Sequence, residues 1–135
     1  MSDQSNFFAL LSRMKYIERW ALMRSSRPEN LSEHSLEVAA IAHCLATIGN
    51  VRYDRGLDAE RAALMGIYHD KTEIVTDDIP TPVNNANGSI HDAYKDVETS
   101  AEETILSTLP PDLRPSFDAI FLGTGDQADA YLRRL

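Results

Sequence analysis

Apolar residues recur every three or four positions along almost the whole chain, and this spacing constrains the fold more than any other feature. It is the period of an α-helix that turns one face towards a core. The first instance runs from Phe7 to Ile17, and others follow to the end of the sequence. No stretch alternates polar and apolar residues as a half-buried strand does. The chain is therefore predicted to be all-α, with five to six helices around a shared core.

Capping residues, glycines and prolines divide this pattern into separate helices. The first carries Phe7 to Ile17 and has Ser5 or Asp3 as its cap. The second is expected to begin near Asn30 or Ser32 and to stop at Gly49. The remaining predictions are a third helix over DAERAALMGIYHDKTEIV capped by Asp58, a loop over TDDIPTPVNNANG, a long helix carrying Ile90 to Ile105, a short helix in PPDLRPSFDAIF and the start of one more in GTGDQADAYLRRL.

Length, charge and cysteine usage exclude several classes of protein. The 135 residues predict one domain over 1–135, and the 43% of hydrophobic residues is enough for a core. A formal net charge of -8 repels phosphate backbones and anionic lipids, so neither nucleic acid nor a membrane is an expected partner. A single cysteine, with no signal peptide or membrane span, indicates a cytoplasmic protein.

Groups that bind metals and transfer protons gather where the third predicted helix ends. His69 and Asp70 are adjacent in the stretch IYHDKTEIVTDDIPTP. Imidazole and carboxylate form a mixed nitrogen and oxygen donor set, which suits Mn, Fe, Co, Ni or Zn better than Ca. Glu73 follows His69 by four residues, so a continuous helix would place both on one face. A carboxylate there is suited to act as a general acid or base.

A second histidine strengthens the metal hypothesis. His34 lies in the first turn of the second predicted helix, 35 residues before His69. If these two helices pack antiparallel, the start of one lies beside the end of the other, and His34 meets His69 and Asp70. Two histidines and an aspartate leave open positions for water and substrate. The alternatives are a helix-terminal histidine with a solvated aspartate, and a His34 that only caps its neighbours.

These motifs resemble those of a known family. SEHSLEVA followed by YHDKTEIVTDDIPTPV resembles the HD-domain metal-dependent phosphohydrolases, and is most similar to their bacterial YfbR-like 5'-deoxynucleotidase branch. The opening FFALLSRMKYIERWALMRSSRPENLSEHS, with its Arg-Trp pair, is similar to the same branch, as are NGSIHDAYKDVE and LPPDLRP. The resemblance covers nearly the whole chain. It implies an HD-domain helical bundle that releases phosphate from deoxyribonucleoside 5'-monophosphates, in a homodimer.

The resemblance also implies roles for individual residues. His34, His69 and Asp70 would hold one divalent metal ion, which could be Co, Mn, Zn, Ni, Fe or Mg. Glu73 would act as acid and base, and Arg19 would orient the phosphate by charge-assisted hydrogen bonds. Trp20 would pack on the nucleoside and reject a 2'-hydroxyl. The nucleotide pocket would be completed by Asp70, Asp78, Ile79, Pro80 and Thr81.

Three departures from the family pattern leave alternatives open. Asn84 stands where the family usually carries lysine, and Lys71 stands where a small residue is common. The family also uses a fourth metal ligand on a later helix; Asp129 is the candidate within the chain, and a residue beyond Leu135, in a longer protein, is favoured over it. The alternative functions are a deoxynucleoside triphosphohydrolase on the same scaffold and a non-catalytic nucleotide-binding domain.

Overall fold

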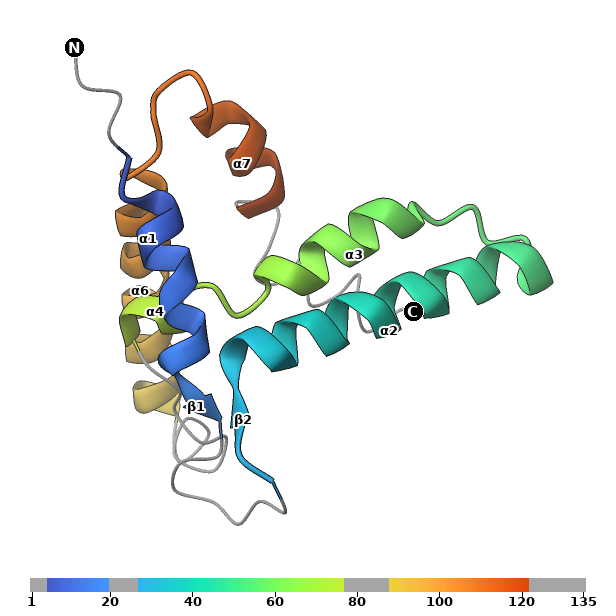
Figure 1. Ribbon diagram of the computed structural model, residues 1–135, viewed down its shortest axis with the longest axis horizontal. Helices are drawn as coiled ribbons and strands as arrows, with labels where there is room; N and C mark the ends of the chain where they lie inside the picture. Colours follow the sequence, from blue (N-terminus) through green and yellow to red (C-terminus); the bar gives the residue numbers. More distant parts are fainter. Residues whose placement is uncertain (1–4, 20–26, 77–87, 122–135) are drawn as a thin grey trace. The chain divides into compact units, whose positions relative to one another are not determined.

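The structure is a computed structural model that describes residues 5–19, 27–76 and 88–121, and helices predominate in it (Figure 1). The all-α prediction is confirmed for these residues. None of their helices is long and apolar enough to cross a membrane. Two compact units are distinguished, one formed by Met1–Leu31 and Lys71–Arg114 and the other by Ser32–Asp70 and Pro115–Leu135.

The first unit combines the N-terminal helix with helices from the middle of the chain. Its helical segments are α1 (Phe7–Leu11), the 3-10 helix η1 (Ser12–Tyr16), α4 (Glu73–Thr76) and α6 (Gly88–Leu106). α1 and α4 both contact α6, and Figure 1 shows the three together. The buried side chains of Met14, Ile17, Leu31 and Ile74 form one core cluster of this unit.

The first predicted helix is helical only as far as Tyr16. Three of its expected apolar positions are buried, with Phe7 at 0%, Met14 at 5% and Ile17 at 8% exposure, and Leu10 and Leu11 are partly buried. Ile17 itself is extended, and its carbonyl accepts a 2.8 Å hydrogen bond from the Leu31 amide. This bond leads into a ribbon in which β1 (Glu18–Arg19) pairs antiparallel with β2 (Glu29–Asn30). Two-residue strands are too short to leave an alternating pattern, so periodicity could not predict them.

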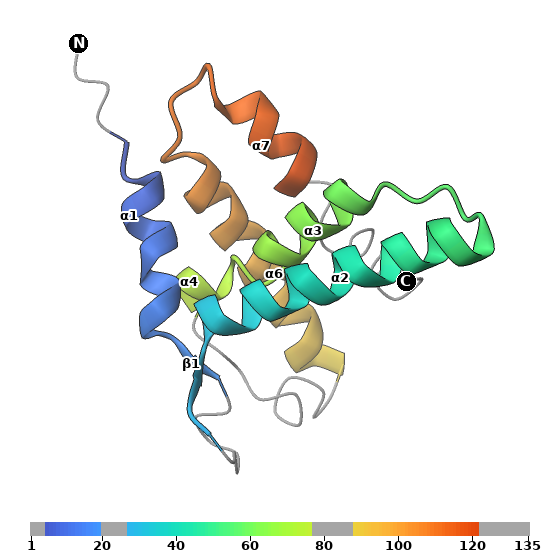
Figure 2. The ribbon, with the colours of Figure 1, turned by 45° about the vertical axis from the view of Figure 1, so that its right-hand side comes forward.

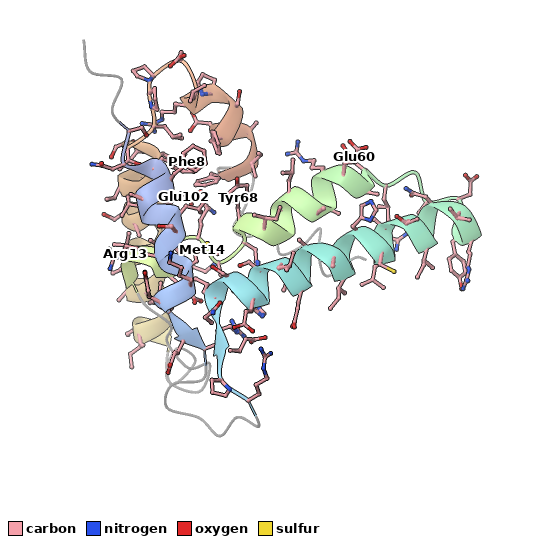
Figure 3. All side chains as sticks on the ribbon, viewed as in Figure 1. Phe8, Arg13, Met14, Glu60, Tyr68 and Glu102 are labelled. Atoms are coloured by element: carbon pink, nitrogen blue, oxygen red, sulfur yellow. The ribbon has the colours of Figure 1, made fainter. Side chains whose placement is uncertain are left out.

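The second unit is built on two helices that run antiparallel and side by side. They are α2 (Leu31–Tyr53) and α3 (Ala59–Tyr68), and both views show them in contact (Figures 1 and 2). Small side chains fill the space between them, namely Ala42, Ala46 and Ala62. The predicted cap of α3 is confirmed, because the Asp58 carboxylate accepts a 3.0 Å hydrogen bond from the Arg61 amide. α7 (Arg114–Phe121) contributes Phe117 and Phe121, whose rings pack on Tyr68 (labelled in Figure 3).

The predicted end of the second helix at Gly49 is wrong, because α2 continues to Tyr53. Gly49 is a buried position within the helix, where an added Cβ would lie 3.2 Å from the Leu57 side chain. The helix ends instead at Asp54, which adopts a left-handed φ of 50°. The Asn50 side chain then fixes the return of the chain: its Nδ2 donates to the Leu57 carbonyl at 2.7 Å, and its Oδ1 accepts from the Leu57 amide at 2.6 Å.

The third predicted helix is two helices separated by a turn. α3 ends at Tyr68, His69 to Thr72 form the turn, and α4 begins at Glu73. The inference that His69 and Glu73 share one helix face is therefore wrong, since it required a continuous helix. At the C-terminal end, PPDLRPSFDAIF does contain a short helix, as predicted, and the expected helix in GTGDQADAYLRRL lies outside the described residues.

Candidate metal centre

The ends of α2 and α3 bring together the three residues that the sequence analysis singled out. His34 lies in the first turn of α2, His69 follows the last residue of α3, and Asp70 lies in the turn beyond it. Because the two helices are antiparallel, the start of α2 meets the end of α3. One nitrogen or oxygen atom from each of the three side chains falls within 4.8 Å of the others.

Both imidazoles point an Nε2 atom at the same carboxylate oxygen. The Asp70 Oδ2 atom lies 2.9 Å from His69 Nε2 and 3.4 Å from His34 Nε2. Two ligands that hold one ion at about 2.1 Å in tetrahedral geometry are about 3.4 Å apart, so these separations suit a shared cation. The side chains keep 16–23% of their surface exposed, so the centre is half-buried and not sealed from solvent.

A backbone carbonyl fixes the orientation of the His69 ring. His69 Nδ1 lies 2.8 Å from the carbonyl oxygen of Gly66. A carbonyl only accepts hydrogen bonds, so Nδ1 carries a proton; loss of the second proton, from Nε2, would leave a lone pair there for a metal. Such a bond to the second ring nitrogen is the usual support of a metal-binding histidine.

Gly66 also sets the distance between the two helices. A Cβ atom built on it would lie 2.7 Å from Ala39 Cα and 2.8 Å from Ala39 N. These are backbone atoms, so no side-chain movement can relieve such a contact. The absence of a side chain at position 66 therefore allows α3 to approach α2 closely enough for His69 to meet His34.

Asp70 is held in its charged form. Burial by itself would raise its pKa, but hydrogen bonds and positive charge from His34 and His69 outweigh that effect and lower the pKa well below its ordinary value. A carboxylate that stays ionised is ready to bind a cation without releasing a proton. Two imidazole nitrogens and this oxygen fit a divalent transition metal ion and leave coordination positions for water or substrate.

The other predicted site residues belong to the first unit or lie outside the described residues. Arg19 is in β1, where its Nε donates a 3.1 Å hydrogen bond to Glu29 Oε2. Glu73 is the half-buried first residue of α4. The residues outside the described ranges are Trp20, Asp78, Ile79, Pro80, Thr81, Asn84 and Asp129.

The sequence analysis missed two residues that contact predicted site residues, namely Gly66, which binds His69, and Glu29, which binds Arg19. Gly66 stands three residues before His69, one helical turn earlier, and a glycine inside an otherwise alanine-rich and leucine-rich helix is a signal of close packing. Glu29 carries no comparable signal. Its pairing with Arg19 depends on the register of a ribbon that the sequence does not reveal.

Comparisons with known proteins agree with this geometry. Residues 6–135 match the family described as 5'-deoxynucleotidase YfbR-like. A 5'-deoxynucleotidase of Vibrio atlanticus is 49% identical over 127 residues, which cover 93% of this chain and 66% of that protein. One of Enterobacter sp. strain 638 is 49% identical over 118 residues, which cover 87% and 59%. The chain thus spans less than two thirds of the length of these curated relatives.

Two solved structures are also similar. A predicted metal-dependent phosphohydrolase of Magnetospirillum magnetotacticum has a TM-score of 0.66 at 31% identity, over 95% of this chain and 65% of that one. The HD phosphohydrolase of cyanophage S-2L, solved with dA and one catalytic Zn²⁺ ion, has a TM-score of 0.56 at 21% identity, over 93% and 78%. The second likeness bears on the fold alone. From the family match over nearly its whole length and its identity to these relatives, the chain belongs to the YfbR-like 5'-deoxynucleotidase family.

Proposed function

We propose that the chain is a metal-dependent phosphohydrolase that releases phosphate from deoxyribonucleoside 5'-monophosphates. The observation that carries this proposal is the convergence of His34, His69 and Asp70 within 4.8 Å, in a chain of this family. These three residues would hold one divalent ion, which would polarise the phosphate and lower the pKa of a water molecule. The geometry suits several transition metals, and cobalt, manganese and zinc are the ones to test first.

The remaining roles are proposed from the positions that match the family motifs. Glu73 would exchange a proton with the attacking water, and Arg19 would hold the phosphate by charge-assisted hydrogen bonds. Trp20 would contact the nucleoside and disfavour a 2'-hydroxyl. The nucleotide pocket would be lined by Asp70, Asp78, Ile79, Pro80 and Thr81. We further propose that the chain acts as one HD domain in a cytoplasmic homodimer.

A product assay tests the substrate. The purified chain is incubated with Mn²⁺, Co²⁺, Zn²⁺ or Mg²⁺ and with dAMP, AMP or dATP, and the products are identified. Inorganic phosphate from dAMP, with little from AMP, is the expected result. Triphosphate released from dATP would instead identify a deoxynucleoside triphosphohydrolase. Binding of dAMP without turnover of any nucleotide would identify a non-catalytic domain.

Replacing Glu73 separates catalysis from metal binding. Glu73→Ala is expected to lower kcat for dAMP by about 100-fold or more, because the proton transfer loses its acid and base. Metal bound at His34, His69 and Asp70 should remain, as measured by the metal content after gel filtration. Full activity in Glu73→Ala would refute the role given to this carboxylate.

A further inference from the structure

The β1–β2 ribbon holds Arg19 against a specific partner. Arg19 and Glu29 are directly opposite each other in the antiparallel register. The Nε–H group of Arg19 donates to Glu29 Oε2 over 3.1 Å, and the two side chains are only 14% and 22% exposed. At this degree of burial solvent screens the pair less than it screens a surface pair, so the bond limits the positions that the guanidinium plane can adopt.

This bond uses the Nε–H group of the guanidinium. Arginine has five N–H donors in a fixed planar fork, and it recognises phosphate by donating two of them in parallel. A carboxylate that fixes the Nε side of this plane also fixes the direction of the two Nη groups. We propose that Glu29 is a positioning residue, which orients Arg19 for the phosphate of the substrate; this inference rests on the function proposed above.

The charge of Glu29 has an effect of the opposite sign. A carboxylate beside Arg19 partly neutralises the positive potential that attracts a phosphate. If neutralisation dominates, removing Glu29 lowers KM. If orientation dominates, removing Glu29 raises KM, because the loosened side chain must be ordered again each time that substrate binds. The direction of the change in KM therefore distinguishes the two effects.

Three variants provide the kinetic test with dAMP. Glu29→Ala is expected to raise KM by about two- to tenfold with a smaller change in kcat, since it removes both the bond and the charge. Glu29→Gln keeps an oxygen that accepts from Arg19 Nε–H, and should restore most of the wild-type KM. Glu18→Ala is the matched control, because it removes the same charge from an exposed position of the same ribbon, and it should leave KM unchanged. An unchanged or lower KM in Glu29→Ala overturns the proposal.

An NMR measurement tests whether Glu29 orients Arg19, and it does not depend on enzymatic activity. In the ¹⁵N-labelled wild-type chain, the Nε–H signal of Arg19 should exchange slowly with water and should shift when inorganic phosphate is added; Arg19→Lys assigns the signal. Glu29→Ala should broaden this signal and weaken its response, while Glu29→Gln should preserve both. A circular dichroism melt shows whether each variant is folded.

The two proposals fail in different ways. If the wild-type chain releases phosphate from no deoxynucleotide, the proposed function fails, and the phosphate titration still decides the role of Glu29. If the wild-type Arg19 signal does not respond to phosphate, or responds equally in Glu29→Ala, the positioning role is wrong even where turnover is present.

Discussion

Lys71 is a buried lysine that pairs with a carboxylate of α6. Its side chain is only 3% exposed, and its Nζ atom lies 3.4 Å from Glu102 Oε1 in α6 (Glu102 is labelled in Figure 3). Burial raises the pKa of Glu102 above its ordinary value, the Lys71 charge lowers it, and Glu103 raises it again. Each member of the pair therefore makes the burial of the other tolerable.

Replacing Lys71 by methionine tests this dependence. The variant is expected to lose about 3 kcal/mol of unfolding free energy near neutral pH, because Glu102 is left buried without its cation. Without that cation the pKa of Glu102 rises further. A carboxyl whose pKa is higher in the folded than in the unfolded state contributes most stability at low pH, and loses that contribution as the pH rises through the folded value.

Urea denaturation at about pH 5.5 and about pH 8 measures the effect. Lys71→Met should be closer to wild type at the lower pH, where Glu102 binds a proton more readily. The double variant Lys71→Met/Glu102→Leu should recover much of the lost stability at both pH values. An equal loss at both pH values would show that the methionine acts through packing rather than through the Glu102 charge.

At the scale of secondary structure elements, the crossing of α2 and α3 determines the centre. The two helices meet at Gly66 and Ala39, where backbone atoms are almost in contact. The ligands lie close to this crossing: His69 is one turn beyond Gly66, and His34 is five residues before Ala39. A small change in the distance between the helices therefore changes the distance between the imidazoles.

Gly66→Ala should separate the two helices. The added methyl group has no room beside Ala39, so we expect a loss of about 1–3 kcal/mol in stability and weaker binding of Mn²⁺ or Co²⁺. Calorimetric metal titration and thermal melts measure both quantities. Gly88→Ala is the matched control, since a Cβ at Gly88 meets no atom within 4 Å, and it should bind metal like wild type. Wild-type affinity in Gly66→Ala would mean that the crossing does not control the ligands.

Helix identity could be predicted from the sequence, while helix ends were predicted less well. The Asp58 cap was predicted correctly because its signal is local, a carboxylate beside the first free amides. Gly49 was misinterpreted, since a glycine stops a helix or permits close packing, and only its neighbours in the folded chain, the side chains of Leu57 and Arg55, distinguish the two. The break between Tyr68 and Glu73 carries no proline or glycine, so no local signal marked it.

At the scale of the whole molecule, cation binding should be coupled to folding. The ligands come from the start of α2 and the end of α3, so they converge only when these helices pack. A ligand that binds only the folded state stabilises it in proportion to the logarithm of its concentration. Stability measured with and without metal therefore reports on the assembled site.

Metal addition is expected to raise the melting temperature by several degrees. When the free metal concentration is about 100 times its dissociation constant, the free energy of unfolding rises by about 2.7 kcal/mol. EDTA should reverse the gain, and His34→Ala should abolish it. His43→Ala is the matched control, because His43 is an exposed histidine on the same helix, and it should melt like wild type with and without metal. A shift that persists in His34→Ala would place the ion elsewhere.

The meeting of His34, His69 and Asp70 could be predicted because antiparallel packing of neighbouring helices follows from a short connection. Their role as metal ligands stays a prediction, as do the roles of Glu73 and Arg19. The pairing of Arg19 with Glu29 could not be predicted, since it depends on the register of two short strands. The contact between Gly66 and Ala39 likewise depends on which faces of two helices meet.

The wide separation of the ligands along the chain has a mechanical consequence. His34 and His69 are 35 residues apart, so an ion bound to both would cross-link the polypeptide into a closed loop. Unlike a disulfide, this link would exist only in the folded state, because the ligands separate when the two helices come apart. A protease that cuts between Asp54 and Asp58 would then leave two fragments held together by the ion as well as by their packing, and a chelator would weaken that association.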